Sequence, residues 1–278
     1  MKPTFHAEPL EEIELSLLLE GVFRATGHDF RAYTRATIRR RVLHAVAAEG
    51  LRTISALQGQ VLRDPAAMQR LRETLAINVT GMFRDPTFFQ ALREQVIPTL
   101  RTHPFIRVWH AGCSTGEEVY SLAILLSEAG LLERTRLYAT DMHAPALGVA
   151  RQGIYPAAKM NAYEAAYQDA GGQADFRRYF TWQYDHALVR ADLRQPIIWG
   201  QHNLATDSSF NEFHLILCRN VLIYFTRPLQ DHVKALLHDS LTPFGILALG
   251  RHETMDFSVH APRFECLNLT EKLYRRVG

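Results

Sequence analysis

Apolar residues recur every three to four positions through the first part of the chain, which is typical of amphipathic helices. The positions that show this spacing most clearly are Leu15, Leu18, Leu19, Ile38, Val42, Leu43, Leu71 and Leu75. Residues 78–81, with the sequence Asn-Val-Thr-Gly, then interrupt the pattern. We therefore predict a small all-helical domain over residues 1–80, followed by a linker.

A further helix is predicted from Pro86, because Asp85 suits the N-cap and proline suits the first helical position. Its buried face would consist of Phe88, Phe89, Leu92, Val96 and Leu100.

Strands and helices alternate after this helix. Strands are predicted around Val108 and over residues 136–140, 213–217 and 245–249, with helices that begin at Glu117, Pro145 and Pro228. The alternation predicts an α/β domain over residues 81–278 with a doubly wound, mainly parallel sheet. Residues 264–267 and 272–275 flank a turn and predict a closing antiparallel pair. Residues 180–202 alternate around the breaker Pro196, so we expect a small β-hairpin insertion there.

Composition excludes several classes of protein. The 278 residues carry a formal net charge of +2, which by itself indicates neither nucleic-acid nor membrane binding. No apolar run has the length of a membrane helix, so we expect no direct membrane insertion. The three cysteines form no CxxC pair and the N-terminus lacks a signal-peptide pattern, so we expect the cytoplasm. The histidines show no ligand spacing, and we predict no metal site.

The most informative segment is residues 107–121, which predicts a buried strand, a glycine turn and a helix start. Gly112 and Gly116 would let the backbone approach a ligand, while Glu117 and Glu118 follow at the helix start. A dinucleotide site places a pyrophosphate at such a helix N-terminus, and two carboxylates would oppose it. The segment therefore favours a ligand with amine or ribose hydroxyl groups, such as S-adenosylmethionine. The alternative is a tight turn without a ligand.

Other candidate residues follow later strands. Asp141 ends a predicted strand where a carboxylate can reach ribose hydroxyls, and we favour this role over a helix N-cap. Arg219 and Asn220 would emerge at the carboxyl edge of the sheet, either as a turn or as part of a site. Tyr224 and Phe225 could add an aromatic wall for a sulfonium cation.

Two polar segments leave their role open. Asn203 and Leu204 could contact an adenine or form a turn. Asn78, Thr80 and Arg84 could form a polar loop or part of the site. The Arg84 guanidinium could hold a carboxylate of the cofactor or of an acidic substrate.

An arginine cluster lies in the predicted helical domain. Arg31, Arg35 and Arg39 are four residues apart, so we expect them on one face of a single helix, and Arg40 and Arg41 extend the cluster. Such a basic face is either solvated surface or a docking site for an acidic protein helix or nucleic acid.

Taken together, these segments resemble one family, the chemotaxis receptor glutamate methyltransferases, over nearly the whole chain. The matching blocks are residues 78–85, 108–121, 138–141, 150–155, 202–204 and 218–225. The resemblance implies a Rossmann-like class I methyltransferase domain that uses S-adenosylmethionine, preceded by a receptor-docking helical domain. It implies the cofactor contacts Asn78, Thr80, Arg84, Glu118, Asp141, Asn203, Leu204, Arg219 and Asn220.

The resemblance also implies the reaction and the partner. Glutamates on the cytoplasmic signalling helices of chemoreceptors would be esterified, with S-adenosylhomocysteine as the second product. Tyr224 matches a tyrosine beside the methyl group, Arg84 is a second candidate catalytic residue, and the docking arginines would be Arg31, Arg35, Arg39 and Arg40. We expect a monomer that binds no nucleic acid. The short segment 179–203 lacks a glycine-rich hairpin turn, so we expect no grip on a receptor C-terminal pentapeptide.

Three alternatives remain at this point. A cofactor-binding adaptor without catalysis would keep the fold, but the aromatic and arginine set argues against it. An RNA methyltransferase would present a catalytic cysteine or an Asn/Asp-Pro-Pro-aromatic motif, and we find neither. A nicotinamide dehydrogenase is disfavoured by the glutamates after Gly116.

Overall fold

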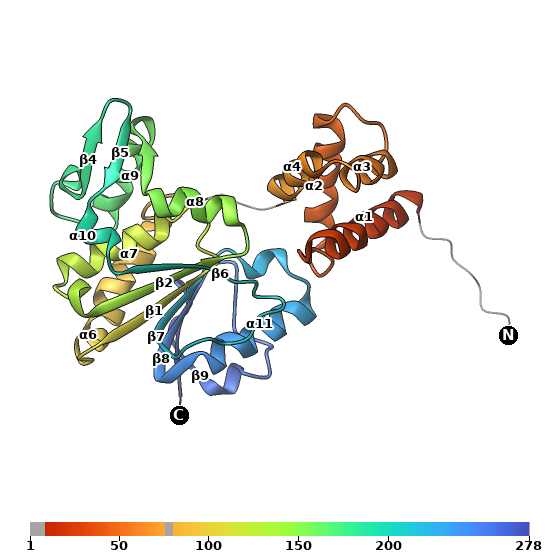
Figure 1. The fold of residues 1–278 in the computed structure, drawn as a ribbon. Coiled ribbons are helices and arrows are strands. Elements are labelled where there is room, and N and C mark those ends of the chain that lie inside the picture. The colour runs from red at the N-terminus through yellow and green to blue at the C-terminus, as the bar shows by residue number, and fades with distance from the viewer. Residues whose placement is uncertain (1–8, 76–79, 278) are drawn as a thin grey trace. The chain divides into compact units, whose positions relative to one another are not determined.

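The computed structural model describes residues 9–75 and 80–277 (Figure 1). The chain divides into two compact units. The first, the helical unit, contains Met1–Ile77 together with Tyr224–Leu229. The second, the α/β unit, contains Asn78–Ile223 and Gln230–Gly278.

The helical unit is built from four amphipathic helices. They are α1 (Leu10–Thr26), α2 (Arg35–Ala48), α3 (Ile54–Val61) and α4 (Pro65–Leu75). The predicted apolar positions form their core, with the exception of Leu43, which is 38% exposed on α2. Arg31 was expected on the same helix as Arg35, but it lies in the turn before α2, which begins at Arg35. The four-residue spacing was therefore a wrong guide to its position.

A short segment from late in the sequence packs within the helical unit. The Thr34 N–H donates to the Tyr224 carbonyl at 2.8 Å, and the Thr226 N–H donates to the Ala32 carbonyl at 2.9 Å. The rings of Tyr33 and Phe225 meet edge to face, 5.1 Å between centroids. Residues 224–229 therefore add a two-stranded backbone pairing to a unit that is otherwise helical.

The α/β unit contains a seven-stranded mixed sheet with the strand order β6-β2-β1-β7-β8-β10-β9. The strands are β1 (Ile106–Ala111), β2 (Thr135–Asp141), β6 (Ile197–Gln201), β7 (Phe213–Cys218), β8 (Leu241–Leu249), β9 (Phe264–Asn268) and β10 (Leu273–Arg276). Neighbours from β6 to β8 run parallel, whereas β10 is antiparallel to both β8 and β9. The predicted doubly wound sheet and its closing antiparallel pair are confirmed.

Helices cover both faces of this sheet, and in Figure 1 α11 lies on the face opposite α6 and α7. The longer helices are α7 (Glu117–Glu128), α8 (Ala144–Gln152), α9 (Ala157–Asp169) and α11 (Arg227–Asp239). The helix predicted from Pro86 is divided into α5 (Pro86–Ala91), a π-helical turn η1 (Leu92–Val96) and α6 (Ile97–Arg101). Shorter elements are η2 (Leu132–Arg134), η3 (Phe176–Tyr179), α10 (Ala191–Arg194), η4 (Leu222–Tyr224) and η5 (Ala261–Arg263). No described helix is both long and apolar enough to cross a membrane.

The expected insertion ends before Pro196, and its hairpin pairs with an additional strand, β3 (Ile154–Pro156). β4 (Phe180–Gln183) and β5 (His186–Val189) form the hairpin, and β3 completes a three-stranded antiparallel sheet. The apolar residues after Pro196 were expected in the insertion, but they form β6, which pairs in parallel with β2 at the edge of the main sheet.

Candidate active site

The strand order reverses between β1 and β7. β1 continues through β2 to β6, whereas β7 continues through β8 to the opposite edge. In open α/β sheets, ligands bind at such a reversal, outside the carboxyl ends of the strands. The loop 112–116 leaves β1 at this edge, and the loop 219–223 leaves β7 beside it. This geometry brings the predicted glycine turn and the predicted Arg219–Asn220 segment together.

The two glycines of the β1 loop are explained by packing within the protein. Both have left-handed backbones, with φ of 79° at Gly112 and 89° at Gly116. A Cβ atom at Gly112 would lie 2.6 Å from a Val221 methyl, and one at Gly116 would lie 2.9 Å from the Ala150 Cβ. The expectation that these positions are bare to admit a ligand is therefore incomplete, because close contact with the loop after β7 and with α8 already requires glycine.

Asp141 holds the β1 loop against the end of β2. The Gly112 and Cys113 N–H groups donate to the Thr140 carbonyl, each at 2.9 Å. The Ser114 N–H donates to Asp141 Oδ2 at 2.8 Å, and the His143 N–H donates to Oδ1 at 2.9 Å. Burial raises the pKa of Asp141, although these N–H donors act in the opposite direction. The N-cap of α8 is His143, so the capping role considered for Asp141 is wrong.

A buried guanidinium connects three segments of this edge. Arg219 donates to Glu118 Oε2 at 2.6 Å and to Asp85 Oδ2 at 2.7 Å, and its side chain is 1% exposed. Its central carbon lies 3.7 Å from the centroid of the Phe88 ring. The carboxylate of Asp85, the N-cap residue of α5, is thus used for Arg219, and it caps no helix N–H. The charge of Arg219 is therefore neutralised by carboxylates of the protein itself.

Glu118 has a strongly perturbed acidity. Burial alone would raise its pKa, but the Arg219 guanidinium outweighs burial and, with His110, lowers the pKa to about 2. His110 Nδ1 lies 3.6 Å from Glu118 Oε1, and neither ring nitrogen has a hydrogen-bond partner among the described residues. Glu118 is therefore ionised at neutral pH and supports Arg219 from the first turn of α7.

The segment before α5 is fastened to α7. The Phe83 N–H donates to Ser121 Oγ at 2.8 Å, and Ser121 Oγ donates to the Glu117 carbonyl at 2.8 Å. Phe83 and Asp85 both have left-handed backbones, with φ of 52° and 57°. Ser114 and Asn220 share this conformation, with φ of 50° and 59°. Non-glycine residues seldom adopt it, and such strain clusters at functional sites.

Three predicted site residues, Asn78, Thr80 and Arg84, belong to the segment 78–85. Thr80 and Arg84 are both half-buried in the segment that leads to α5. Asn78 lies outside the described residues. The predicted cofactor role of these three residues stays a prediction.

Asn203 and Leu204 lie in the loop after β6. Asn203 Oδ1 accepts the Ala205 N–H at 3.0 Å, so its side-chain oxygen already supports a local turn. Leu204 is buried. His202 packs edge to face on Trp109, 5.3 Å between ring centroids, which fixes the start of this loop against β1. A contact of Asn203 or Leu204 with adenine stays a prediction.

Tyr224 and the docking arginines belong to the helical unit. Arg31 pairs with Glu20 and Asp29, each at 2.8 Å, and Arg39 pairs with Glu11. Arg35 donates to Ser16 Oγ at 3.0 Å, and Arg40 is exposed. Exposed ion pairs contribute only about 0 to 1 kcal/mol, so these arginines can exchange their partners for other carboxylates.

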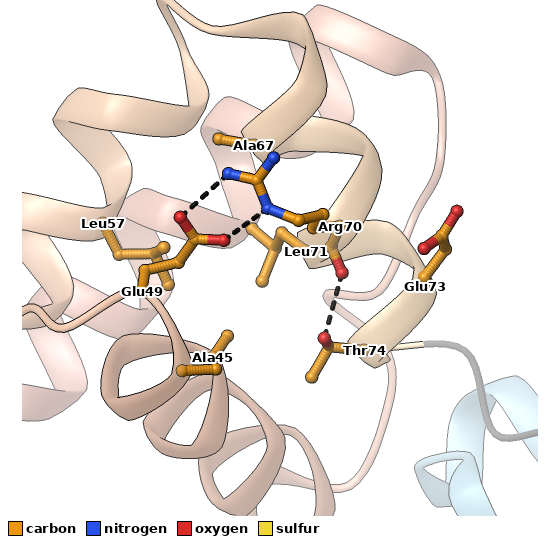
Figure 2. Close-up of a pocket in the computed structure, with 9 residues that line it drawn as sticks. Ala45, Glu49, Leu57, Ala67, Arg70, Leu71, Glu73 and Thr74 are labelled. Carbon is orange, nitrogen blue, oxygen red and sulfur yellow. Dashed lines mark hydrogen bonds and ion pairs between the residues drawn. The ribbon is translucent and has the colours of Figure 1, made fainter.

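The helical unit also contains a hollow of about 600 Å³ (Figure 2). Arg70 and Glu49 form a two-bonded ion pair across it at 2.6 and 2.9 Å, and Gln60 donates to the same carboxylate at 2.7 Å. None of the predicted site residues lines this hollow. Arg70 and Glu49 are paired with each other, and Glu73 accepts a hydrogen bond from Gln69 at 2.8 Å. We assign the hollow no ligand.

The sequence interpretation missed Glu253, a buried carboxylate in the loop after β8. Its Oε2 accepts the Asn220 N–H at 2.9 Å, so it reaches the same β7 loop as the predicted residues. No local pattern identifies it, because three of its four main-chain partners lie about thirty residues earlier in the sequence.

A mainly parallel sheet with a reversal of strand order, and carboxylates at the loops beside it, is typical of α/β proteins that bind nucleotide-like cofactors. Similarity to known proteins identifies the family. Residues 78–273 match the family described as CheR methyltransferase, SAM binding domain. Residues 13–76 match the CheR methyltransferase all-alpha domain. The chain therefore belongs to the CheR methyltransferase family and is an S-adenosylmethionine-dependent methyltransferase.

Curated relatives agree with this assignment. The chain is 49% identical to Cher3 of Pseudomonas putida, over 95% of this chain and 97% of the relative. It is 33% identical to chemotaxis protein methyltransferase 2 of Pseudomonas aeruginosa, over 72% of each. It is 30% identical to the chemotaxis protein methyltransferase of Listeria innocua, over 84% of this chain and 86% of the relative.

The low pKa of Glu118 predicts a pH-dependent contribution to stability. Because its folded pKa of about 2 lies below the ordinary 4.5, the contribution is present above about pH 4.5 and is lost as pH falls toward 2. The difference in unfolding free energy between the native protein and Glu118→Gln should shrink by roughly 2 kcal/mol from about pH 6 to pH 3. Urea unfolding followed by tryptophan fluorescence measures this, since Trp109, Trp182 and Trp199 all lie in the α/β unit. A constant difference across this range would contradict the assignment.

Proposed function

We propose that this enzyme transfers the methyl group of S-adenosylmethionine to glutamate side chains on the cytoplasmic signalling helices of chemoreceptors. The products are γ-glutamyl methyl esters and S-adenosylhomocysteine. Family membership over both units is the observation that carries the proposal. The relatives named chemotaxis protein methyltransferases support a receptor as the methyl acceptor.

The chemistry of the β1 edge fits this cofactor. Asp141 accepts the Ser114 and His143 N–H groups on different oxygens, and a backbone hydrogen bond from Met142 adds to them. A carboxylate has about four acceptor positions, so capacity remains for a ribose hydroxyl. Arg219 is already neutralised by Glu118 and Asp85, which leaves it poorly suited to a pyrophosphate. The residues that we propose to contact the cofactor are Asn78, Thr80, Arg84, Glu118, Asp141, Asn203, Leu204, Arg219 and Asn220.

The proposed reaction needs positioning more than proton transfer. When bound, the cofactor supplies an electrophilic methyl group on a sulfonium. The acceptor glutamate has an ordinary pKa of about 4.3 and is already a nucleophilic anion at neutral pH, so no general base is required. Alignment of the two reactants can contribute roughly 7 to 11 kcal/mol in favourable cases.

Arg84 or Arg219 would orient a carboxylate, and the two terminal nitrogens of Arg219 already donate to Glu118 and Asp85. Following the resemblance, the Tyr224 hydroxyl would help to fix the reacting group. The arginines Arg31, Arg35, Arg39 and Arg40 would dock the acidic receptor helices, with Glu11, Glu20 and Asp29 as their partners in the unbound protein.

The first test is transfer of labelled methyl from S-adenosylmethionine to chemoreceptor signalling fragments. We expect label on receptor glutamates that is released by mild alkali, because a carboxyl ester hydrolyses under conditions that leave methylated amines intact. Tight cofactor binding by calorimetry without transfer would instead favour a non-catalytic adaptor or another acceptor.

The two catalytic candidates are tested by Arg84→Ala and Tyr224→Phe. A hydrogen bond to a charged group contributes about 1.5 to 3 kcal/mol, so each substitution should reduce methyl transfer by roughly ten- to a hundredfold. Turnover under saturating cofactor is the measurement, with cofactor affinity determined separately. Full turnover in both variants, with cofactor binding intact, would refute these roles.

The docking surface is tested by the double substitution Arg39→Glu with Arg40→Glu. The KM for the receptor should increase by about tenfold or more, because the reversed charges repel acidic helices. The affinity for the cofactor should stay constant. Arg24→Glu with Arg63→Glu is the matched control, since it makes the same charge change on exposed residues of the same unit. An equal effect of both pairs would argue for net charge alone.

A further inference from the structure

A single buried carboxylate organises the loop that follows β7. Glu253 is 5% exposed and lies in the loop after β8. Its Oε2 accepts the N–H groups of Asn220 at 2.9 Å and Gly250 at 2.6 Å. Its Oε1 accepts the N–H groups of Val221 at 2.8 Å and Ile223 at 3.3 Å. All four interactions have a main-chain N–H as the donor.

The loop needs this acceptor because of its backbone conformation. Asn220 is left-handed, with φ of 59°, and the N–H groups around it converge on one point. A buried N–H without a partner costs about 1 to 3 kcal/mol. Without Glu253, the loop would have to rearrange to find other acceptors.

The neighbouring backbone is shaped to admit the carboxylate. A Cβ atom at Gly250 would lie 2.7 Å from Glu253 Oε2 and 2.8 Å from the Asn220 nitrogen. A side chain at this position would therefore displace either the carboxylate or the loop. Gly250 and Glu253 thus form one arrangement that holds Asn220 in place.

We propose that Glu253 is a positioning residue for cofactor binding, acting through the main chain of the loop 219–223. This loop carries Arg219 and Asn220, and the inference rests on the proposed function in that it takes these two residues as cofactor contacts. Glu253 itself would not touch the ligand. Its carboxylate would fix the main chain of this loop, and with it the positions from which the two side chains extend.

The charge of Glu253 matters as well as its shape. A carboxylate offers two acceptor oxygens, whereas the amide of glutamine offers one oxygen and turns an NH₂ group toward the other N–H donors. Glu253→Gln therefore keeps the volume but removes the acceptor oxygen of two of the four N–H groups. Glu253→Ala removes both oxygens and leaves space of about the size of acetate.

The experiment compares the affinity of the folded enzyme for S-adenosylmethionine and S-adenosylhomocysteine by calorimetry. Tryptophan fluorescence is used to choose a temperature at which each variant is fully folded. We expect Glu253→Gln and Glu253→Ala to bind both ligands about tenfold more weakly or worse. Added acetate should restore much of the affinity of Glu253→Ala, whereas acetamide, which has the same shape without the charge, should not.

The matched control is Glu128→Gln, a substitution of another carboxylate of the α/β unit that accepts several hydrogen bonds. Glu128 lies at the far end of α7, where it accepts hydrogen bonds from Arg93 at 2.6 Å and Tyr179 at 2.8 Å. It should lower thermal stability and leave the affinity of the folded enzyme unchanged.

Unchanged affinity in folded Glu253→Gln and Glu253→Ala would overturn the proposal, and so would equal rescue by acetate and acetamide. These outcomes are separate from the identity of the methyl acceptor. A native enzyme that binds the cofactor but does not methylate receptors would refute the proposed function and leave the affinity test of Glu253 intact.

Discussion

The arrangement of the active-site edge depends on one buried cation. Arg219 is held between Glu118 and Asp85, with its flat face on Phe88. These contacts join the loop after β7, the first turn of α7 and the start of α5, which are far apart in the sequence. Removal of one partner from a buried ion pair leaves an uncompensated charge and typically costs about 3 to 5 kcal/mol. The three segments are therefore constrained to move as one.

At three of the four left-handed residues of this edge, a side-chain oxygen from a neighbouring element accepts the main-chain N–H. The N–H of left-handed Phe83 is bound by the Ser121 hydroxyl. The N–H groups of left-handed Ser114 and Asn220 are bound by the carboxylates of Asp141 and Glu253. Each unfavourable conformation costs on the order of 1 to 3 kcal/mol and persists only where the surroundings fix it. Side-chain oxygens from neighbouring elements provide that constraint, so loop shape here is determined by the fold and not by local sequence.

Much of the fold could be predicted from the sequence because its elements depend on local periodicity. The strand at Val108, the helix from Glu117 and the closing pair were all found in this way. The apolar residues after Pro196 were assigned to the wrong sheet, because an apolar run specifies a strand but not its neighbour. Arg31 was placed on a helix because spacing does not show where a helix begins. Glu253 could not be found at all, since its partners are main-chain groups that carry no sequence signal.

Because the helical unit includes the segment Tyr224–Leu229, it is not one continuous stretch of sequence. The family description divides the chain between residues 76 and 78, but the six residues 224–229 belong to the helical unit and contact Ala32, Tyr33 and Thr34. The chain therefore passes between the units three times, at Ile77, Ile223 and Leu229. A fragment that ended at Ile77 would lose the backbone partners of Ala32 and Thr34 and the aromatic partner of Tyr33. Recombination of this helical unit with another catalytic unit would have to exchange two separate stretches of coding sequence together.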